Sequence, residues 1–243
     1  MVPKMKNMKN INLHPRTDSV EPIMVEDTCN QPRRRRRLSK DAVNQFNKHG
    51  MAPLHVACRR GQRGLVRDLL MHGANLNMVD AAGRTPLMYA CKNVHSNIVR
   101  ALVQLGAHMD TRDDNGCTAL EIACRRNNIY AMRHLLEHGA DVEGIQKYGD
   151  ETLLHKACRW SNLAVVRLLV FHGADIDAES ADGTTPLHLA VERRDEETAA
   201  FLVERGANVN RANDKGVTAM HLAYSTRQYD LAEFLLGNIL DQR

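Results

Sequence analysis

The hexapeptide Thr185-Pro186-Leu187-His188-Leu189-Ala190 recurs, with substitutions, along most of the chain. Its counterparts begin at Ala52, Thr85, Thr118, Thr152 and Thr218. The successive steps between the six copies are 33, 33, 34, 33 and 33 residues. An apolar doublet and usually a Gly-Ala pair, such as Gly206-Ala207, follow each copy. A constant period of this length predicts a stack of equivalent structural units that together form one elongated domain.

Local signals in the fifth copy predict that each unit is a pair of antiparallel helices with a projecting turn. Asp182-Gly183 marks the turn, since glycine tolerates a positive φ. Thr185 can cap the first helix and Pro186 suits its first position, whereas Asp195 can cap the second helix. Gly206 is placed to end that second helix in a left-handed conformation. One helix pair cannot bury its own apolar face, so neighbouring units must stack.

Each second helix carries apolar residues at helical spacing, and we expect this stripe to be buried. The stripes are Leu65/Val66/Leu69/Leu70, Ile98/Val99/Leu102/Val103, Ala131/Met132/Leu135/Leu136, Val165/Val166/Leu169/Val170, Ala199/Leu202/Val203 and Leu231/Ala232/Leu235/Leu236.

The period and the hexapeptide resemble those of the ankyrin-repeat family over roughly residues 42–243. The resemblance implies an all-α solenoid of stacked helix-turn-helix units with projecting β-turns. We expect six repeats, at about residues 47–79, 80–112, 113–146, 147–179, 180–212 and 213–243, in a domain that spans 41–243. The resemblance also implies that the hexapeptide histidine bonds to the hexapeptide threonine and to neighbouring backbone, tying one turn to the next. These histidines are His55, His155, His188 and His221.

Copies two to four depart from the repeat pattern at the histidine position or in their length. The second has Met88 in place of the histidine, and the third has Glu121 there and lacks the proline as well. The fourth has an extra residue within 144–151. We expect the middle units to be locally weaker. Two explanations stay open, because the departures could serve a partner or reflect sequence drift.

Residues 1–40 form a separate basic segment, which we predict to be a disordered tail. They hold 10 Lys or Arg against 4 Asp or Glu, whereas the remainder of the chain holds 23 against 25. Four prolines and the lack of apolar periodicity leave too little apolar surface to offset the entropy of ordering. The run Arg33, Arg34, Arg35, Arg36 and Arg37 is a candidate nuclear-import signal or anionic-partner patch. A non-specific basic tail and weak nucleic-acid contact are the alternatives.

Ser39 follows this arginine run and is a candidate phosphorylation site. Arg36-Arg37-Leu38-Ser39 resembles the target of a basophilic kinase. A phosphate would place roughly −1.5 to −2 charges beside the arginines and could mask them.

The cysteines point to a packed core rather than to disulfides or metal. Cys58, Cys91, Cys124 and Cys158 occupy one equivalent position in successive copies. Adjacent helices pack about 8–10 Å apart, whereas a disulfide needs Cα atoms within about 4.4–6.8 Å. One ligand per repeat also cannot converge on a zinc ion. We therefore predict small buried hydrophobes, with free thiols at Cys29 and Cys117.

Other functional classes find no support in the sequence. No apolar run of about 18 residues predicts a membrane span, and the first residues lack a secretory signal. No Ser/His/Asp or Cys/His set, phosphate-binding glycine loop or His-Glu-x-x-His helix occurs outside the repeat. We expect no catalytic residues, no metal and no cofactor. We expect the protein to be located in the nucleus, the cytoplasm or both.

The carboxyl ends of the first helices carry cations in most copies. They read Arg59-Arg60, Lys92-Asn93, Arg125-Arg126, Arg159-Trp160, Glu192-Arg193-Arg194 and Ser225-Thr226-Arg227. The helix dipole alone favours cations there by about 0.3–1 kcal/mol, but the recurring arginine pairs exceed this need. Trp and Arg are enriched at binding hot spots. The resemblance implies that partners contact turn tips and inner-helix ends.

We therefore predict non-catalytic protein binding, as an adaptor, inhibitor or regulatory subunit, with an acidic segment of the partner in the concave groove. We expect a monomer apart from its partner. The predicted contact residues are Arg59, Arg60, Lys92, Arg125, Arg126, Tyr148, Arg159, Trp160, Arg193 and Arg194, with Trp160 as the anchor. One alternative is a nuclear regulator similar to the inhibitors of Rel-type transcription factors. Another is nucleic-acid binding. An array of interleaved aromatic residues would support it, but the chain has few of them.

Overall fold

The computed structural model of the chain describes residues 42–143 and 151–241. The arginine run, Ser39 and Tyr148 lie outside these residues. The described parts contain a short 3-10 helix, η1 (Ala42–Asn44), and the α-helices α1 (Pro53–Arg60), α2 (Arg63–Met71), α3 (Pro86–Lys92), α4 (Ser96–Gln104), α5 (Ala119–Arg125), α6 (Ile129–Glu137), α7 (Leu153–Arg159), α8 (Leu163–Phe171), α9 (Pro186–Glu192), α10 (Glu196–Glu204), α11 (Ala219–Ser225) and α12 (Tyr229–Asp241).

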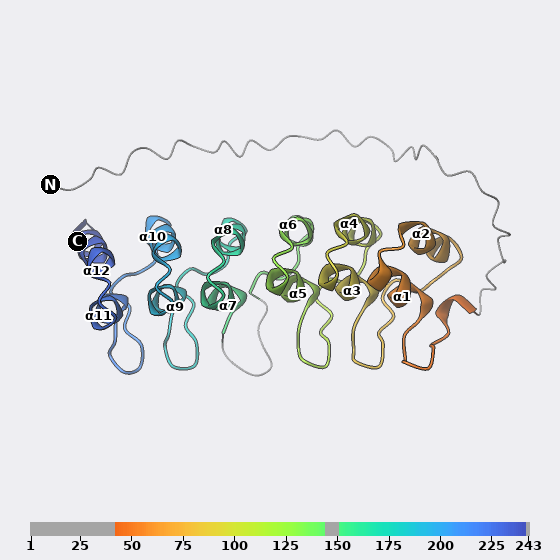
Figure 1. The fold of residues 1–243 in the computed structure, drawn as a ribbon, viewed down its shortest axis with the longest axis horizontal. Helices are drawn as coiled ribbons and strands as arrows, with labels where there is room; N and C mark the ends of the chain where they lie inside the picture. Colours follow the sequence, from red (N-terminus) through yellow and green to blue (C-terminus); the bar gives the residue numbers. More distant parts are fainter. Residues whose placement is uncertain (1–41, 144–150, 242–243) are drawn as a thin grey trace, which may run out of the picture. The chain divides into compact units, whose positions relative to one another are not determined.

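These helices stack as the repeat period predicts. The odd-numbered helices form one layer and the even-numbered helices form a second, while the turns between units project beyond the odd-numbered layer (Figure 1). Each odd-numbered helix contacts the next odd-numbered helix as well as its own partner in the pair. The predicted all-α solenoid is confirmed.

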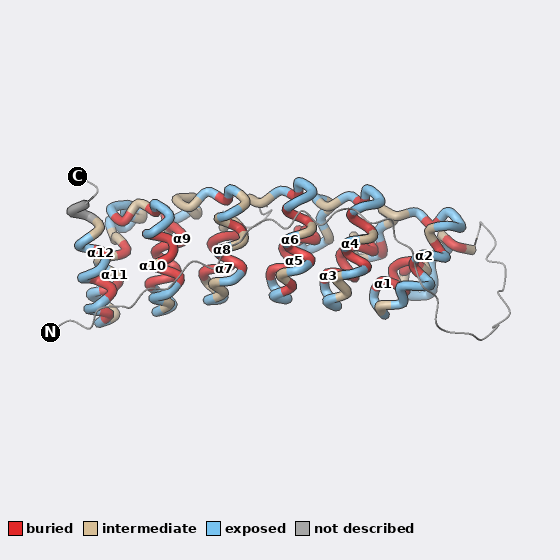
Figure 2. Tube along the Cα trace, turned by 90° about the horizontal axis from the view of Figure 1, so that it is seen from above, coloured by how far each residue is buried: buried red, intermediate tan, exposed pale blue. Residues whose placement is uncertain are grey.

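The core is formed by buried residues from both layers and from successive units, and these residues (red) follow the helix pairs along the stack in Figure 2. The predicted apolar stripes are largely buried, but Leu65 and Leu236 are 39% and 41% exposed. Equivalents of Leu65 in the next units, such as Ile98, are 2% exposed or less in α4, α6 and α8. Leu65 belongs to the first helix pair and Leu236 to the last, so each lacks one neighbouring unit to cover it.

The predicted helix caps are present. The hydroxyl groups of Thr85, Thr118, Thr152 and Thr218 accept a hydrogen bond from the backbone N–H three residues on, at 3.3–3.4 Å. Asp195 accepts from the backbone N–H of Thr198 at 3.1 Å. These side chains satisfy donors that the first turn of a helix leaves unpaired.

The hexapeptide histidines tie successive units together, as the family resemblance implied. Nδ1 of His55, His155 and His188 accepts the backbone N–H of the capping residue at 3.1–3.2 Å. Nε2 donates to the carbonyl of Arg84, Thr184 or Val217 in the next unit at 2.9–3.0 Å. Burial lowers the pKa of all three rings, which keeps them in the neutral form that this geometry requires.

The two copies without this histidine use other contacts. In the second, Sδ of Met88 lies 3.4 Å from the backbone N of Thr85, which preserves the local contact at the cap. In the third, Glu121 pairs with Nζ of Lys156 in the next unit at 2.8 Å, and both side chains are largely buried. An ion pair therefore links the third and fourth units where a histidine links others.

The connection between the helices of each pair turns through a left-handed residue. Gly61 occupies this position in the first unit, with φ 70°, and a Cβ there would lie 2.6 Å from the imidazole of His95. The later units have other residues at positive φ, among them Val94 at 61° and Asn127 at 52°. This turn ends the first helix and leaves its last side chains exposed.

Candidate protein-binding groove

A row of cations follows the exposed ends of the odd-numbered helices. Arg59, Lys92 and Arg125 occupy equivalent positions in the last turns of α1, α3 and α5, and we call them the inner row. All three are exposed. Among the described residues, no carboxylate forms an ion pair with any of them. Their charges are thus available to a ligand.

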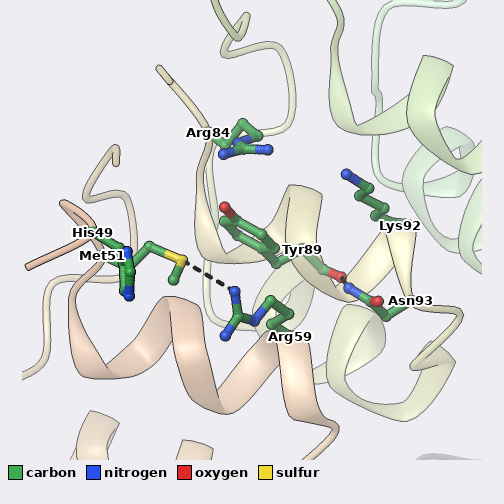
Figure 3. Close-up of a pocket in the computed structure, with 7 residues that line it drawn as sticks. All are labelled: His49, Met51, Arg59, Arg84, Tyr89, Lys92 and Asn93. Carbon is green, nitrogen blue, oxygen red and sulfur yellow. Dashed lines mark hydrogen bonds between the residues drawn. The ribbon is translucent and has the colours of Figure 1, made fainter. Parts of the chain in front are cut away.

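A first cleft of about 490 Å³ lies over the first two units (Figure 3). It is lined by His49, Met51, Arg59, Arg84, Tyr89, Lys92 and Asn93. In Figure 3, the Tyr89 ring lies between Met51 on one side and Lys92 on the other. Arg84 lies above the ring in this view. Nη1 of Arg59 lies 3.8 Å from Sδ of Met51, which holds the guanidinium over the cleft.

A buried hydrogen-bonded group supports this cleft. The hydroxyl of Tyr89 donates to Oδ2 of Asp80 at 2.7 Å, and Nη2 of Arg84 lies 3.2 Å from the same oxygen. Burial and the Asp80 carboxylate raise the pKa of Tyr89 to about 12. Burial opposes ionisation of Asp80, but hydrogen bonds from Tyr89 and from backbone N–H groups lower the pKa of its carboxyl. Asp80 therefore balances the charge of Arg84, and the unbalanced charges of the cleft are Arg59 and Lys92.

A second cleft of about 360 Å³ adjoins the first. It is lined by Arg84, Lys92, Asp113, Asn115, Ile122, Arg125 and Arg126. Arg84 and Lys92 line both clefts, so the two lie side by side over the first three units, and together we call them the groove. Nη2 of Arg125 lies 3.8 Å from Sγ of Cys117, the same orientation that Arg59 has toward Met51.

The cationic character changes beyond the third unit. Arg159 occupies the next equivalent position, but it forms an ion pair with Glu151. Glu192 takes the position after that. Trp160 is 38% exposed, and neither cleft is lined by Trp160 or by Arg159. The structure therefore does not bring the predicted anchor Trp160 into the cleft that contains Arg125 and Arg126.

Most of the remaining predicted contact residues also lie outside the two clefts. Arg60, Arg193 and Arg194 are exposed but line neither cleft. Tyr148 lies outside the described residues, and its proposed role stays a prediction. Sequence reasoning missed Arg84, which lies one residue before the capping Thr85 and reaches the groove from the turn.

The sequence analysis also did not predict a second row of cations. Arg67, Arg100 and Arg133 are exposed at equivalent positions of α2, α4 and α6, and we call them the outer row. The repeat period alone could have revealed this row. Neither cleft is lined by any of its members. It therefore offers a charge-matched control for the groove.

The four repeated cysteines serve the fold rather than this groove. Cys58, Cys91, Cys124 and Cys158 are at most 1% exposed. Burial raises the pKa of the Cys58 thiol to about 12 and raises that of the other three as well. Cys117 is also a buried free thiol. Within the described ranges, His, Cys, Asp and Glu side chains form no group of three or more suited to a metal ion.

Among the helices that the structure describes, none has both the length and the apolar character that a membrane span needs.

The family model for ankyrin repeats in three copies matches residues 36–113, 54–146, 105–180 and 154–242. The chain is similar to the ankyrin repeat domain of Bcl-3, which is described as a unique member of the IkappaB protein family. The identity is 29%, with a TM-score of 0.73 over 79% of this chain and 86% of that one. A chain from the complex of the Bd0816 predatory endopeptidase of Bdellovibrio bacteriovorus with immunity protein Bd3460 is 26% identical. Its TM-score is 0.67 over 79% of this chain and 99% of that one.

Curated relatives share a shorter stretch. The scaffold protein ILK of Homo sapiens and that of Mus musculus are each 40% identical to this chain over 42 residues. These residues make up 17% of this chain and 9% of ILK, so the match spans less than a tenth of the relatives' length.

Proposed function

The chain belongs to the ankyrin-repeat family, and we propose that its groove over the first three units binds an acidic segment of another protein. Ankyrin repeats indicate a protein–protein interaction module. The finer assignment of an acidic ligand is supported by one observation. The inner row presents Arg59, Lys92 and Arg125 along two adjoining clefts, and among the described residues none of the three has a carboxylate partner.

Charge complementarity of this kind favours a negatively charged partner and steers its approach. Each exposed ion pair contributes only about 0.2–1 kcal/mol, so three such pairs supply selectivity more than raw affinity. The remaining affinity must come from other contacts. Trp160 is a candidate for one of these where the partner extends past the third unit. Changing Trp160 to Ala should then weaken the complex without changing its dependence on salt.

Nucleic acid is the ligand of a different class that a cationic groove could take. Single-stranded nucleic acid is bound through aromatic side chains on which bases stack. Tyr89, the aromatic residue that lines the first cleft, is 4% exposed and holds its ring against Arg84 and Asp80. A ring in this position has little face left for stacking, which favours a protein ligand.

The test is affinity capture with the full chain as bait, analysed for both protein and nucleic acid, with and without nuclease. Three baits are compared: wild type, the inner-row variant Lys92→Glu/Arg125→Glu, and the outer-row variant Arg100→Glu/Arg133→Glu. We expect a protein with an acidic segment that survives nuclease treatment and is lost from the inner-row bait alone. Recovery that is lost on nuclease treatment would identify nucleic acid as the ligand. Equal recovery of the protein by all three baits would exclude the groove as its binding site.

The similarity to the Bcl-3 ankyrin domain favours a second candidate function, regulation of a Rel-type transcription factor in the nucleus. The run Arg33–Arg37 would then act as the import signal and Ser39 as the phosphorylation site that masks it. Replacing the five arginines with Ala in a fluorescent fusion should move the protein from nucleus to cytoplasm. A chain that stays nuclear after this change, or that fails to retain a purified Rel-type dimer, would argue against this role.

A further inference from the structure

The charges of the groove repeat with the spacing of the helix stack. Arg59, Lys92 and Arg125 come from equivalent positions of consecutive units. Arg59 and Arg125 also point the same way, since each guanidinium lies 3.8 Å from the sulfur of the residue eight positions earlier. Neighbouring packed helices lie about 8–10 Å apart. The groove therefore presents one unpaired cation about every 8–10 Å along the stack.

Among regular backbone conformations, the polyproline II helix matches this spacing. It rises about 3.1 Å per residue with three residues per turn, so every third side chain returns to the same face after about 9.3 Å. A β-strand rises about 3.3 Å per residue, but its successive side chains alternate, so residues three apart face opposite sides. In an α-helix, side chains return to the same face after about 5.4 Å and again, seven residues on, after about 10.5 Å, and neither spacing falls within 8–10 Å.

We propose that the groove selects acidic segments in polyproline II conformation with an acidic residue at every third position. This inference rests on the proposed function. Each of the three carboxylates would pair with one member of the inner row. The residues between them would lie in the first and second clefts, whose linings include Tyr89 and Ile122 at equivalent positions. The partner is thus recognised by the register of its charges as well as by their sign.

The structure also limits the motif to three acidic residues. The next equivalent cation, Arg159, is already paired with Glu151, and the position after it is the acidic Glu192. A fourth acidic residue in register would meet a charge that is already balanced. A fifth would meet one of the same sign, so extending the motif should not tighten binding.

Three labelled nonapeptides of identical composition, three Glu and six Pro, test this register. In the first, Glu stands at positions one, four and seven; in the second, at one, three and five; in the third, at four, five and six. The proline content holds all three in the same conformation, so only the spacing of charge differs. Binding to the full chain is measured by fluorescence anisotropy at low salt. Because an exposed ion pair changes an equilibrium constant by up to about five-fold, the first peptide should bind about ten-fold more tightly than either isomer.

Two single variants separate this inference from the proposed function. Lys92→Glu should abolish the preference for the first peptide, whereas Arg100→Glu, an exposed cation of the same unit in the outer row, should leave it unchanged. If the wild type binds the three isomers with equal affinity and only Lys92→Glu loses affinity, the proposed register is wrong but the groove still binds acidic segments. Equal loss in both variants would overturn both. Failure of the wild type to bind any isomer would overturn the register as well, and the capture experiment would then decide the proposed function.

Discussion

Val94 and Asn127 occupy equivalent left-handed positions, and exchanging their side-chain types should shift stability in opposite directions. Both connect the two helices of a unit, with φ 61° and 52°. Asn tolerates this region because its short polar side chain bonds locally, whereas a β-branched residue is strained there. Val94 is 54% exposed, so much of its side chain makes no contact that could offset the strain.

The magnitudes follow from the cost of a left-handed conformation. Asn127→Val should lower the free energy of unfolding by about 1–2 kcal/mol, since Asn127 is exposed and little else changes. Val94→Asn should raise it by about 0.5–1 kcal/mol, because the relief of strain is partly offset by the loss of a half-buried apolar side chain.

Urea unfolding measures both changes, followed by helical circular dichroism and by the fluorescence of Trp160, the single tryptophan. Val94→Gly is a useful control, since it relieves the strain and also raises the entropy of the unfolded chain. Shifts of the same sign in Val94→Asn and Asn127→Val would refute the reasoning, as would an Asn127→Val variant as stable as the wild type.

Further predictions concern the contacts between units. The free energy of unfolding should fall as pH is lowered from about 7 toward 5. The folded-state pKa values of His55, His155 and His188 are lowered, so below about pH 6.5 the unfolded chain binds protons that the folded chain does not. Each ring therefore lowers the free energy of unfolding by up to about 1.4 kcal/mol per pH unit. A flat profile between pH 7.5 and 5.5 in urea melts would contradict this. Glu121→Ala should cost about 3 kcal/mol because it leaves Lys156 largely buried without its partner, while replacing both residues with Leu should recover most of that loss. Denaturation of the two variants decides this point, and equal losses in both would show that the ion pair is not the link.

Much of the fold could be predicted because it is set within a single repeat. The caps at Thr85 and Asp195 and the buried position of Cys58 depend on neighbours a few residues away or on the same helix. The exposure of Leu65 and Leu236 could not be read from their helices, because it depends on which unit lies at an end of the stack.

The site was less predictable because it depends on contacts between units. Helix ends identified the inner row, but the clefts arise where turns and helices of different units meet. Arg84 reaches the groove from a turn, and Glu151 neutralises Arg159 across eight residues. Neither contact follows from helical periodicity. The replacement of a histidine by the pair Glu121 and Lys156, 35 residues apart, likewise requires the stack itself.

We propose that the groove over the first three units holds the acidic segment of a partner. The most direct test is calorimetric titration of the partner recovered by capture into wild type, Lys92→Glu/Arg125→Glu and Arg100→Glu/Arg133→Glu. The two variants carry the same change in charge on opposite layers of the same units. We predict that the inner-row variant loses at least ten-fold in affinity, while the outer-row variant stays within about two-fold of the wild type. Equal losses in both variants, or a loss in the outer-row variant alone, would contradict the account.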